Sequence, residues 1–283
     1  MRTLLFTLLS TIAPIAEAAT PTARELDAAI QRTTSGGYWG AALVVRDGET
    51  LLSRGYGDAD YAGTPNTPDT LFEIASVSKQ FTATAVLHLV QEGRLSLDTT
   101  LADLYPNRVG DYRDVTVEQL LSHTSGLDPL GGVPYDSEIE RDAFIERALS
   151  RPPVSTPGQN YAYSNVGYAL LAAIVESVTG QSFEDYAREH LFAAAGLDDT
   201  GFVNEPQLDR TRVATRLSLA PETSTSADWY YGWGYRGMGG VVTTLNDLAR
   251  WSQALRTATI LTKRWRAELF HPRSTGDALG WEV

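Results

Sequence analysis

Apolar and polar positions along the chain follow both helical and strand periods. Near the amino terminus, residues 23–34 (ARELDAAIQRTT) predict a helix that ends at Gly36-Gly37. Two apolar runs then flank Asp47-Gly48, and a pair of this kind between such runs favours a tight β-hairpin turn. The chain therefore opens with a predicted helix followed by a predicted hairpin.

Helical patterns fill the middle of the chain. The first begins within residues 72–98 (FEIASVSKQFTATAVLHLVQEGRLSLD) and closes at Gly93. Apolar residues four positions apart, followed by a stop at Gly180, predict another helix over residues 164–180. Shorter helices are predicted within residues 116–127, 142–150 and 182–196.

The last part of the chain changes character again. A glycine-aromatic loop at residues 229–240 (WYYGWGYRGMGG) precedes a predicted helix at 244–255 and a predicted strand at 277–283 (DALGWEV). This order of elements predicts an α+β body with a helical region inserted at about 76–205. Tyr230, Tyr231, Trp233 and Tyr235 of the loop either line a cleft or pack inside the protein, and the pattern does not decide between these roles.

Composition narrows the classes of function. The chain has 283 residues, 43% of them hydrophobic, which is enough to bury the core of one large domain or two small ones. A net charge of −12 argues against binding to nucleic acid or to anionic membranes. There is no cysteine, and the four histidines have no metal-ligand spacing, so we expect no disulfide, no metal and no cofactor.

The amino terminus has the pattern of a secretory signal peptide over residues 1–18. Arg2 provides the positive start, an apolar run follows, and Ala16-Glu17-Ala18 is a small-residue cleavage site. A membrane anchor is the alternative, but the run is too short to span a bilayer and contains Pro14. We therefore expect a periplasmic or secreted protein whose mature domain occupies residues 19–283, with no membrane span after cleavage.

Ser76 and Lys79 are the first candidates for chemistry. Residues three apart on a helix face the same way, with Cβ atoms about 5–6 Å apart. A serine hydroxyl becomes a strong nucleophile when a base removes its proton, and a desolvated lysine can be that base, whereas arginine cannot. The chain contains only two lysines, Lys79 and Lys263. A solvent-exposed lysine on a helix remains the simpler alternative.

Tyr163 and Asn165 are the second pair of candidates. They lie two residues apart in the segment 157–168 (PGQNYAYSNVGY) and point to the same side if that segment is extended. A tyrosine can relay a proton beside a cation, and an asparagine can bind a substrate amide and orient the lysine. The alternative is that Ser164 or Asn165 caps the following helix and that Tyr163 is packed.

In combination these segments resemble the serine β-lactamase-related family, in the branch of class C β-lactamases, D-Ala-D-Ala peptidases and family VIII-type esterases. The resemblance extends from about residue 25 to the end of the chain. Its specificity comes from Ser-x-x-Lys followed by HTSGL and Tyr-x-Asn in this order. The residues that carry it lie at 76–79, 120–127, 157–186, 196–202 and 237–251.

The resemblance implies a β-lactamase/transpeptidase-like fold, with an antiparallel sheet flanked by helices and a helical subdomain. It implies that Ser76 attacks an acyl carbonyl, that Lys79 and Tyr163 transfer protons and that Asn165 contacts the substrate. The backbone N–H of Ser76 would supply half of an oxyanion hole. His123 is expected to hold a loop, because no acidic partner is placed to orient it for proton transfer.

The family also has a third motif, of Lys-Thr-Gly or His-x-Gly type, which this sequence does not contain. The expected C-terminal strands are missing, so the domain is predicted to be incomplete and this chain to be poorly stable and weakly active. The substrate stays open among an ester, a β-lactam, a D-amino-acid peptide and a peptidoglycan-like compound. A non-catalytic penicillin-recognising binding protein, or an inactive fragment, is the alternative; the oligomeric state is undetermined.

Overall fold

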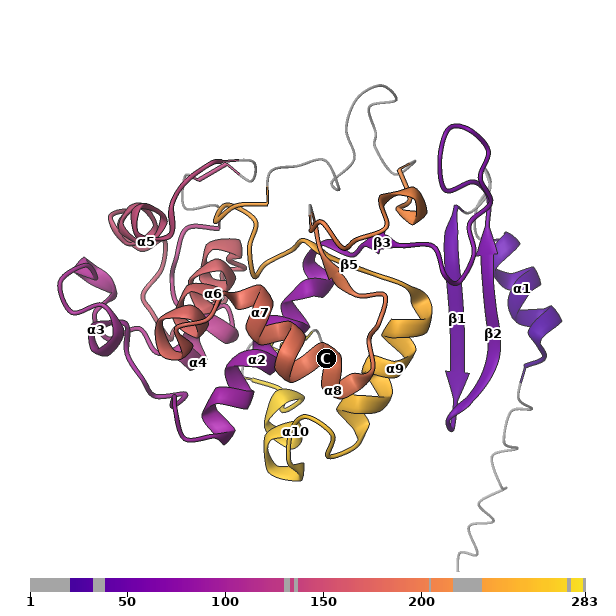
Figure 1. The fold of residues 1–283 in the computed structure, drawn as a ribbon. Helices are drawn as coiled ribbons and strands as arrows, with labels where there is room; N and C mark the ends of the chain where they lie inside the picture. Colours follow the sequence, from indigo (N-terminus) through magenta and orange to yellow (C-terminus); the bar gives the residue numbers. More distant parts are fainter. Residues whose placement is uncertain are drawn as a thin grey trace, which may run out of the picture.

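The computed structural model describes residues 21–32, 39–129, 133–134, 137–203, 205–215, 231–273 and 276–281. Within these residues, helices gather around two central ones, and a two-stranded hairpin lies at one side of the body (Figure 1). The central helices are α2 (Lys79–Gln91) and α6 (Asn165–Thr179). Gly93 and Gly180 follow their ends, as the sequence predicts.

Burial explains why these two helices are central. Every residue of α2 except His88 and Gln91 is buried, which is the expected position for a helix without a polar face. Helix α6 buries a continuous stretch from Val166 to Val175. Their side chains belong to one hydrophobic cluster, in which the ring of Phe81 from α2 stacks on that of Trp251 with centroids 4.3 Å apart.

Most of the remaining helices surround this pair. On the subdomain side they are α3 (Leu101–Leu104), η2 (Gly110–Tyr112), α4 (Val117–Leu121), α5 (Arg141–Leu149), α7 (Phe183–Ala187) and α8 (Ala193–Ala195). The others are α1 (Ala23–Arg32), η4 (Arg210–Arg212), α9 (Leu245–Arg256) and α10 (Lys263–Leu269). Between α7 and α8 the helix widens into a π-helical turn, η3 (Arg188–Phe192), which the sequence pattern does not reveal.

The predicted hairpin is formed by β1 (Gly40–Arg46) and β2 (Glu49–Tyr56), paired antiparallel from Gly40 opposite Tyr56 to Arg46 opposite Glu49. At its tip, Asp47 and Gly48 have φ of 53° and 84°, as a tight turn between strands requires. The hairpin lies between α1 and α9 (Figure 1). Residues Gly36-Gly37 lie outside the described part of the chain.

A second sheet supports the segment that leads into α2. It has three short antiparallel strands in the order β3-β5-β4, with β5 (Val241–Thr243) in the centre. Strand β3 (Phe72–Glu73) lies on one side of β5 and β4 (Gly201–Phe202) on the other. The architecture is therefore the predicted α+β fold, with antiparallel sheets and helices packed around them.

The strand predicted at residues 277–283 is wrong for its described part. Residues 276–281 form bends and a single bridge position at Asp277 instead: the Arg273 amide donates to the Asp277 carbonyl (2.8 Å), and the Ala278 amide donates to the Trp281 carbonyl (2.8 Å). The Leu279 amide bonds the Leu269 carbonyl at the end of α10 (3.2 Å). These bonds hold the segment against residue 273 and the end of α10, so its described residues form no regular strand. Residues 282–283 lie outside the described residues.

Candidate active site

The chain reaches Ser76 through a strained connection after β3. Ala75 has φ of 45°, which is unusual for a residue other than glycine. The Glu73 carboxylate holds this turn, because its Oε1 accepts from the amides of Ala75 (2.9 Å) and Gly240 (3.0 Å) and from the Tyr235 hydroxyl (2.7 Å). Ser76 thereby lies in the 3-10 turn η1 (Ala75–Ser78), directly before α2.

Lys79 is buried beside Ser76. Its Nζ donates to Ser76 Oγ (3.1 Å), Asn165 Oδ1 (2.8 Å) and the Met238 carbonyl (2.9 Å). These three acceptors match the three protons of an ammonium group. Lys79 is only 3% exposed, and this burial lowers its pKa to about 7. The alternative of a solvent-exposed lysine is therefore excluded by the structure.

Tyr163 and Asn165 meet the same two residues from the other side. The Tyr163 hydroxyl donates to Ser76 Oγ (2.8 Å), and its ring centroid is 4.9 Å from Lys79 Nζ. Ser164 is the N-cap of α6, since its Oγ accepts from the Gly167 amide (3.1 Å). Asn165 is the first residue of α6 and directs its side chain to Lys79 rather than capping the helix.

His123 supports the site without a charge. It is buried and has φ of 57°, and its Nδ1 accepts from the Ser164 amide (3.1 Å). Burial, assisted by the nearby Lys79, lowers the pKa of His123 to about 3, so the imidazole is neutral at ordinary pH. This position agrees with a residue that holds a loop: it fixes the segment that carries Tyr163.

A backbone segment whose contacts with the site were not predicted, residues 237–241, completes the surroundings of Lys79. The Gly237 carbonyl accepts from Thr82 Oγ1 (2.5 Å), the Met238 carbonyl accepts from Lys79, and the Val241 amide donates to Ser78 Oγ (3.1 Å). A Cβ at Gly237 would lie 2.7 Å from both the Ala172 Cβ and the Tyr168 carbonyl. The clustered glycines of this loop are the one sequence signal of such a close approach.

The described aromatic residues of the glycine-aromatic loop at residues 229–240 pack inside the protein. Trp233 and Tyr235 are buried, and Trp233 stacks on Phe144 with centroids 5.9 Å apart. Tyr231 packs against the same core. None of these three lines the cleft beside Ser76. Tyr230 lies outside the described residues.

The cleft beside Ser76 has a volume of about 330 Å³ and mostly apolar walls. Tyr161 and Val77 are exposed at its edge, by 42% and 51%. Such a cleft suits an apolar group attached to a reacting carbonyl. Its lining residues are Ser76, Val77, Lys79, Gln80, His123, Tyr161, Tyr163, Asp277, Ala278, Gly280 and Trp281.

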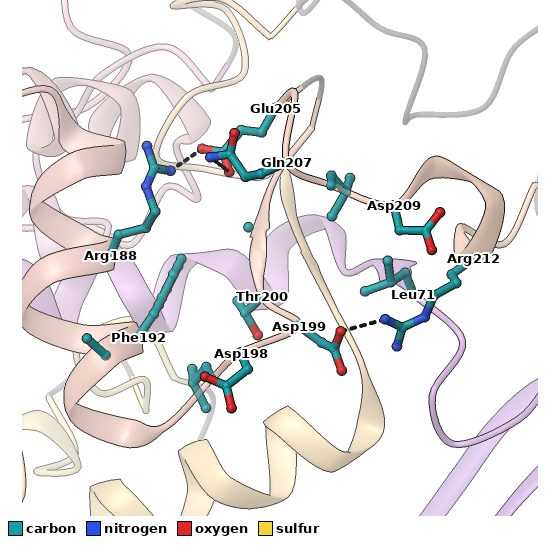
Figure 2. Close-up of a pocket in the computed structure, with 14 residues that line it drawn as sticks. Leu71, Arg188, Phe192, Asp198, Asp199, Thr200, Glu205, Gln207, Asp209 and Arg212 are labelled. Atoms are coloured by element: carbon teal, nitrogen blue, oxygen red, sulfur yellow. Dashed lines mark hydrogen bonds and ion pairs between the residues drawn. The ribbon is translucent and has the colours of Figure 1, made fainter.

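A larger pocket of about 470 Å³ lies elsewhere, between η3 and the segment that leads to η4 (Figure 2). Both of its arginines are paired: Arg188 pairs with Glu205, and Arg212 pairs with Asp199 at 2.5 Å. Figure 2 shows both pairs along the wall. This pocket holds none of the four candidate residues, so its size does not make it the active site.

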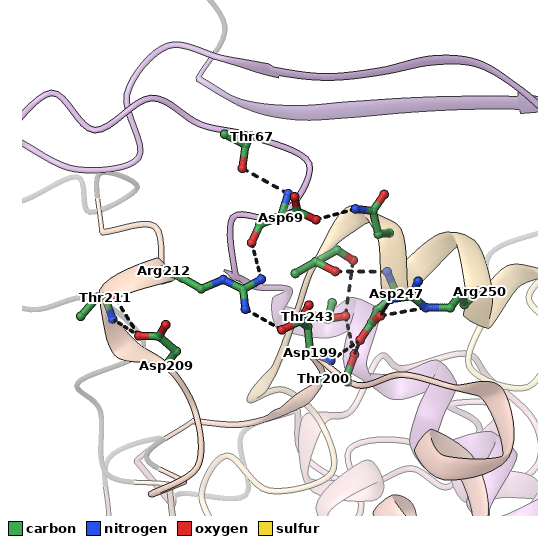
Figure 3. Close-up of polar contacts among 12 residues, drawn as sticks. Thr67, Asp69, Asp199, Thr200, Asp209, Thr211, Arg212, Thr243, Asp247 and Arg250 are labelled. Carbon is green, nitrogen blue, oxygen red and sulfur yellow. Dashed lines mark hydrogen bonds and ion pairs between the residues drawn. The ribbon is translucent and has the colours of Figure 1, made fainter.

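A polar network beside that pocket joins α9 to the strands (Figure 3). Asp247 is fully buried near the start of α9, and its Oδ2 accepts from the Asp199 amide (2.9 Å) and the Thr200 hydroxyl (2.7 Å). Its Oδ1 pairs with Arg250 at 2.5 Å. Two segments that carry the family resemblance, residues 196–202 and 237–251, therefore meet at this carboxylate.

Taken together, the fold and the Ser-Lys-Tyr-Asn arrangement define a β-lactamase/transpeptidase type of protein. The profile of the Beta-lactamase family matches residues 26–280, which is most of the chain. The chain belongs to this family.

Known proteins with similar sequences or structures support the same assignment. A penicillin-binding protein of Bacillus subtilis is 30% identical over 252 residues, covering 82% of this chain and 55% of the relative. The structure of a penicillin-binding protein from Bacillus halodurans is 28% identical with a TM-score of 0.72, covering 87% of this chain and 78% of that one. A D-amino acid amidase from Ochrobactrum anthropi SV3 is 28% identical with a TM-score of 0.69, covering 82% and 70%. The chain thus spans about half the length of the Bacillus subtilis relative.

Proposed function

We propose that the protein is a serine hydrolase that forms an acyl-enzyme on Ser76. The observation that carries the proposal is the convergence of two proton-bearing groups on one hydroxyl: Lys79 Nζ at 3.1 Å and the Tyr163 hydroxyl at 2.8 Å. Lys79 has a pKa near 7, so a large fraction is neutral at physiological pH and can accept a proton. An arginine in the same place would remain charged.

In the proposed reaction, Ser76 Oγ bonds to the acyl carbon while its proton passes to neutral Lys79. The carbonyl oxygen becomes an oxyanion, and the Ser76 backbone N–H is one donor to it. Lys79 returns the proton through Tyr163 to the leaving group as the old acyl bond breaks. Water then attacks the acyl-enzyme with the same two groups in reversed roles, which regenerates Ser76. Asn165 holds Lys79 in position throughout and contacts the substrate.

The substrate class proposed is an ester, a β-lactam or a D-amino-acid peptide or amide. The support is the apolar cleft of about 330 Å³ together with the similarity to penicillin-binding proteins and a D-amino acid amidase. An esterase or peptidase-like activity is favoured over a dedicated β-lactamase, because the family branch is broad.

Intact-protein mass spectrometry with benzylpenicillin and with a p-nitrophenyl ester tests this function. We expect one acyl adduct, mapped to Ser76 by proteolysis and lost in Ser76→Ala. Ser78→Ala is the matched control, because Ser78 belongs to the same turn but its Oγ accepts from the Val241 amide. An adduct that persists in Ser76→Ala would refute the proposed nucleophile.

We also propose that the protein is exported, with cleavage after Ala18. The support is the charged start, apolar run and small-residue site at residues 1–18, which lie outside the described residues. Within the part of the chain that the structure describes, no helix combines the length and apolar character needed to cross a membrane. Mass spectrometry of protein recovered from the periplasm or the medium tests the cleavage site; a mature chain that still begins at Met1 would contradict it.

A further inference from the structure

We propose that Glu73 is a positioning residue of the active site, and that one oxygen of its carboxylate fixes the Ser76 turn and the Met238 carbonyl together around Lys79. The inference rests on the proposed function for the role of Ser76. It begins from the glycine-aromatic loop at residues 229–240, whose described aromatic residues do not line the cleft but whose last residues contact the site.

Two of the three acceptors of Lys79 belong to separate backbone segments. Ser76 lies in the turn η1 that follows β3, whereas Met238 lies in the loop that precedes β5. The regular pairing of β3 with β5 ends at Glu73, three residues before Ser76. Past that point, the turn and the loop must still be held in register if both acceptors are to reach the same ammonium group.

The Glu73 carboxylate connects the two segments past the end of β3. Its Oε1 accepts from the Ala75 amide (2.9 Å) on the side of the turn and from the Gly240 amide (3.0 Å) on the side of the loop. Ala75 has φ of 45°, and the bond to its amide stabilises this strained conformation. One oxygen atom therefore joins the residue before Ser76 to the residue two positions after Met238.

Tyr235 of the loop orients this carboxylate. Its hydroxyl donates to the same Oε1 of Glu73 (2.7 Å), and its side chain is buried. A Cβ at Gly239 would lie 2.6 Å from the Tyr235 ring, so only glycine lets the loop backbone approach the ring this closely. The glycine-aromatic pattern of the sequence thereby gains a role in the site: it holds the carboxylate that connects loop and turn.

The titratable groups that face Lys79 do not include a carboxylate that sets its pKa. The rings of Tyr163 and Tyr168 have centroids 4.9 and 5.6 Å from its Nζ, and His123 is neutral with a pKa of about 3. Asp277 lines the same cleft. Among the described residues, burial alone is the cause of the lowered pKa of Lys79. A carboxylate such as Glu73 therefore influences Lys79 through the position of its acceptors, and not through charge.

Loss of this connection has an effect of definite sign. An ammonium group is favoured by each acceptor that it bonds, so Lys79 has a lower pKa when Ser76 Oγ or the Met238 carbonyl moves away. General unfolding has the opposite effect, because a Lys79 that is exposed to water regains its ordinary, higher pKa. The direction of the change thus separates a positioning role from a loss of stability.

The test compares two substitutions that separate length from charge. Glu73→Gln keeps the length and an acceptor oxygen but loses the charge. Glu73→Asp keeps the charge; its shorter side chain can still bond the amide two residues on, but it cannot also reach Gly240 and Tyr235. Glu176→Asp is the matched control, because Glu176 also accepts from a backbone amide, that of Phe183 (3.1 Å), near the C-terminal end of α6.

The readout is the pKa of Lys79 itself, measured by NMR. Lys79 and Lys263 are the only lysines of the chain, so isotope-labelled lysine in a Lys263→Arg background gives one side-chain signal to titrate. This measurement does not depend on turnover. Acylation of Ser76 by benzylpenicillin and by a p-nitrophenyl ester is followed on the same proteins by intact-protein mass spectrometry.

We expect the pKa of Lys79 in Glu73→Asp to lie about one pH unit below the wild-type value, and acylation of Ser76 to be about 10²-fold slower. Glu73→Gln and Glu176→Asp should keep the pKa close to that of the wild type. A fall in Glu73→Gln as large as that in Glu73→Asp would show that charge matters, and the inference would be wrong. An unchanged or raised pKa in Glu73→Asp would refute it as well. If the pKa values follow the expected order but even the wild type is not acylated on Ser76, the proposed function fails while the positioning role of Glu73 stands.

Discussion

At the scale of single residues, the informative feature of Lys79 is that it is a lysine in a chain whose other basic residues are almost all arginine. Only Lys79 and Lys263 remain in the chain, and one of them is buried against Ser76, Asn165 and the Met238 carbonyl. Arginine would satisfy the hydrogen bonds but could not lose a proton. Burial that lowers the pKa of Lys79 to about 7 therefore matters only if the proton must leave.

The pH dependence of activity follows from this pKa. In the proposed reaction Lys79 acts as a base in its neutral form, which becomes the major form as pH rises through about 7. We expect kcat/KM for a neutral ester to rise about tenfold per pH unit below that value and to level off above it. His123 does not contribute to this rising limb of the pH-rate profile, because its pKa is about 3.

Lys79→Arg should abolish the limb and lower kcat/KM by about 10²–10⁴-fold. Lys263→Arg is the matched control, because Lys263 is exposed at the start of α10. The measurement is a pH-rate profile of both variants. A profile of Lys79→Arg that keeps the limb near pH 7 would assign the titration to another group.

Asn165 offers a second test of the same base. Asn165→Asp would place a carboxylate about where Oδ1 now accepts from Lys79 Nζ, at 2.8 Å. An opposite charge at this distance should move the limb upward by about one to three pH units. The helix should tolerate the change, because an acidic residue in the first turn of α6 suits the helix dipole. A limb that stays near pH 7 in the Asp variant, with the fold intact by circular dichroism, would contradict the assigned role.

At the scale of elements, local signals predict the elements well and their contacts less well. The hairpin at Asp47-Gly48 and the helix that ends at Gly180 were predictable, because turn residues and apolar spacing act over a few positions. The site was predictable where it depends on Ser76, Lys79, Tyr163 and Asn165. Glu73 and the Met238 carbonyl were not, because they contact the site only after distant strands have paired.

The Asp247 network gives a prediction about these contacts between elements. Asp247→Ala would leave the Asp199 amide and the Thr200 hydroxyl without their buried acceptor and Arg250 without its partner. We expect a loss of about 3 kcal/mol in the free energy of unfolding, measured by urea denaturation. Asp209→Ala is the control: Asp209 is exposed and only caps η4, so the loss should be much smaller. Equal losses in the two variants would show that the buried network adds no more than a surface cap.

At the scale of the whole molecule, burial is unevenly distributed. Helices α2 and α6 lie inside one large cluster, whereas α1 has no buried residue and the hairpin buries little besides Leu52 and Tyr56. Local opening free energies follow the density of buried contacts. The hairpin with α1 should therefore open well before the helical body that carries Ser76.

Native-state hydrogen exchange in low urea tests this difference. We expect amides of α2 and α6 to exchange only through global unfolding, and amides of β1 and β2 to exchange faster through a smaller opening. Leu52→Ala sharpens the test, because removing this buried side chain should cost the hairpin about 2–3 kcal/mol and speed its exchange. If the hairpin opens separately, exchange in α2 and acylation of Ser76 should change little in that variant. Faster exchange in α2 by the same factor would instead show that hairpin and body unfold as one unit, so that the site depends on both.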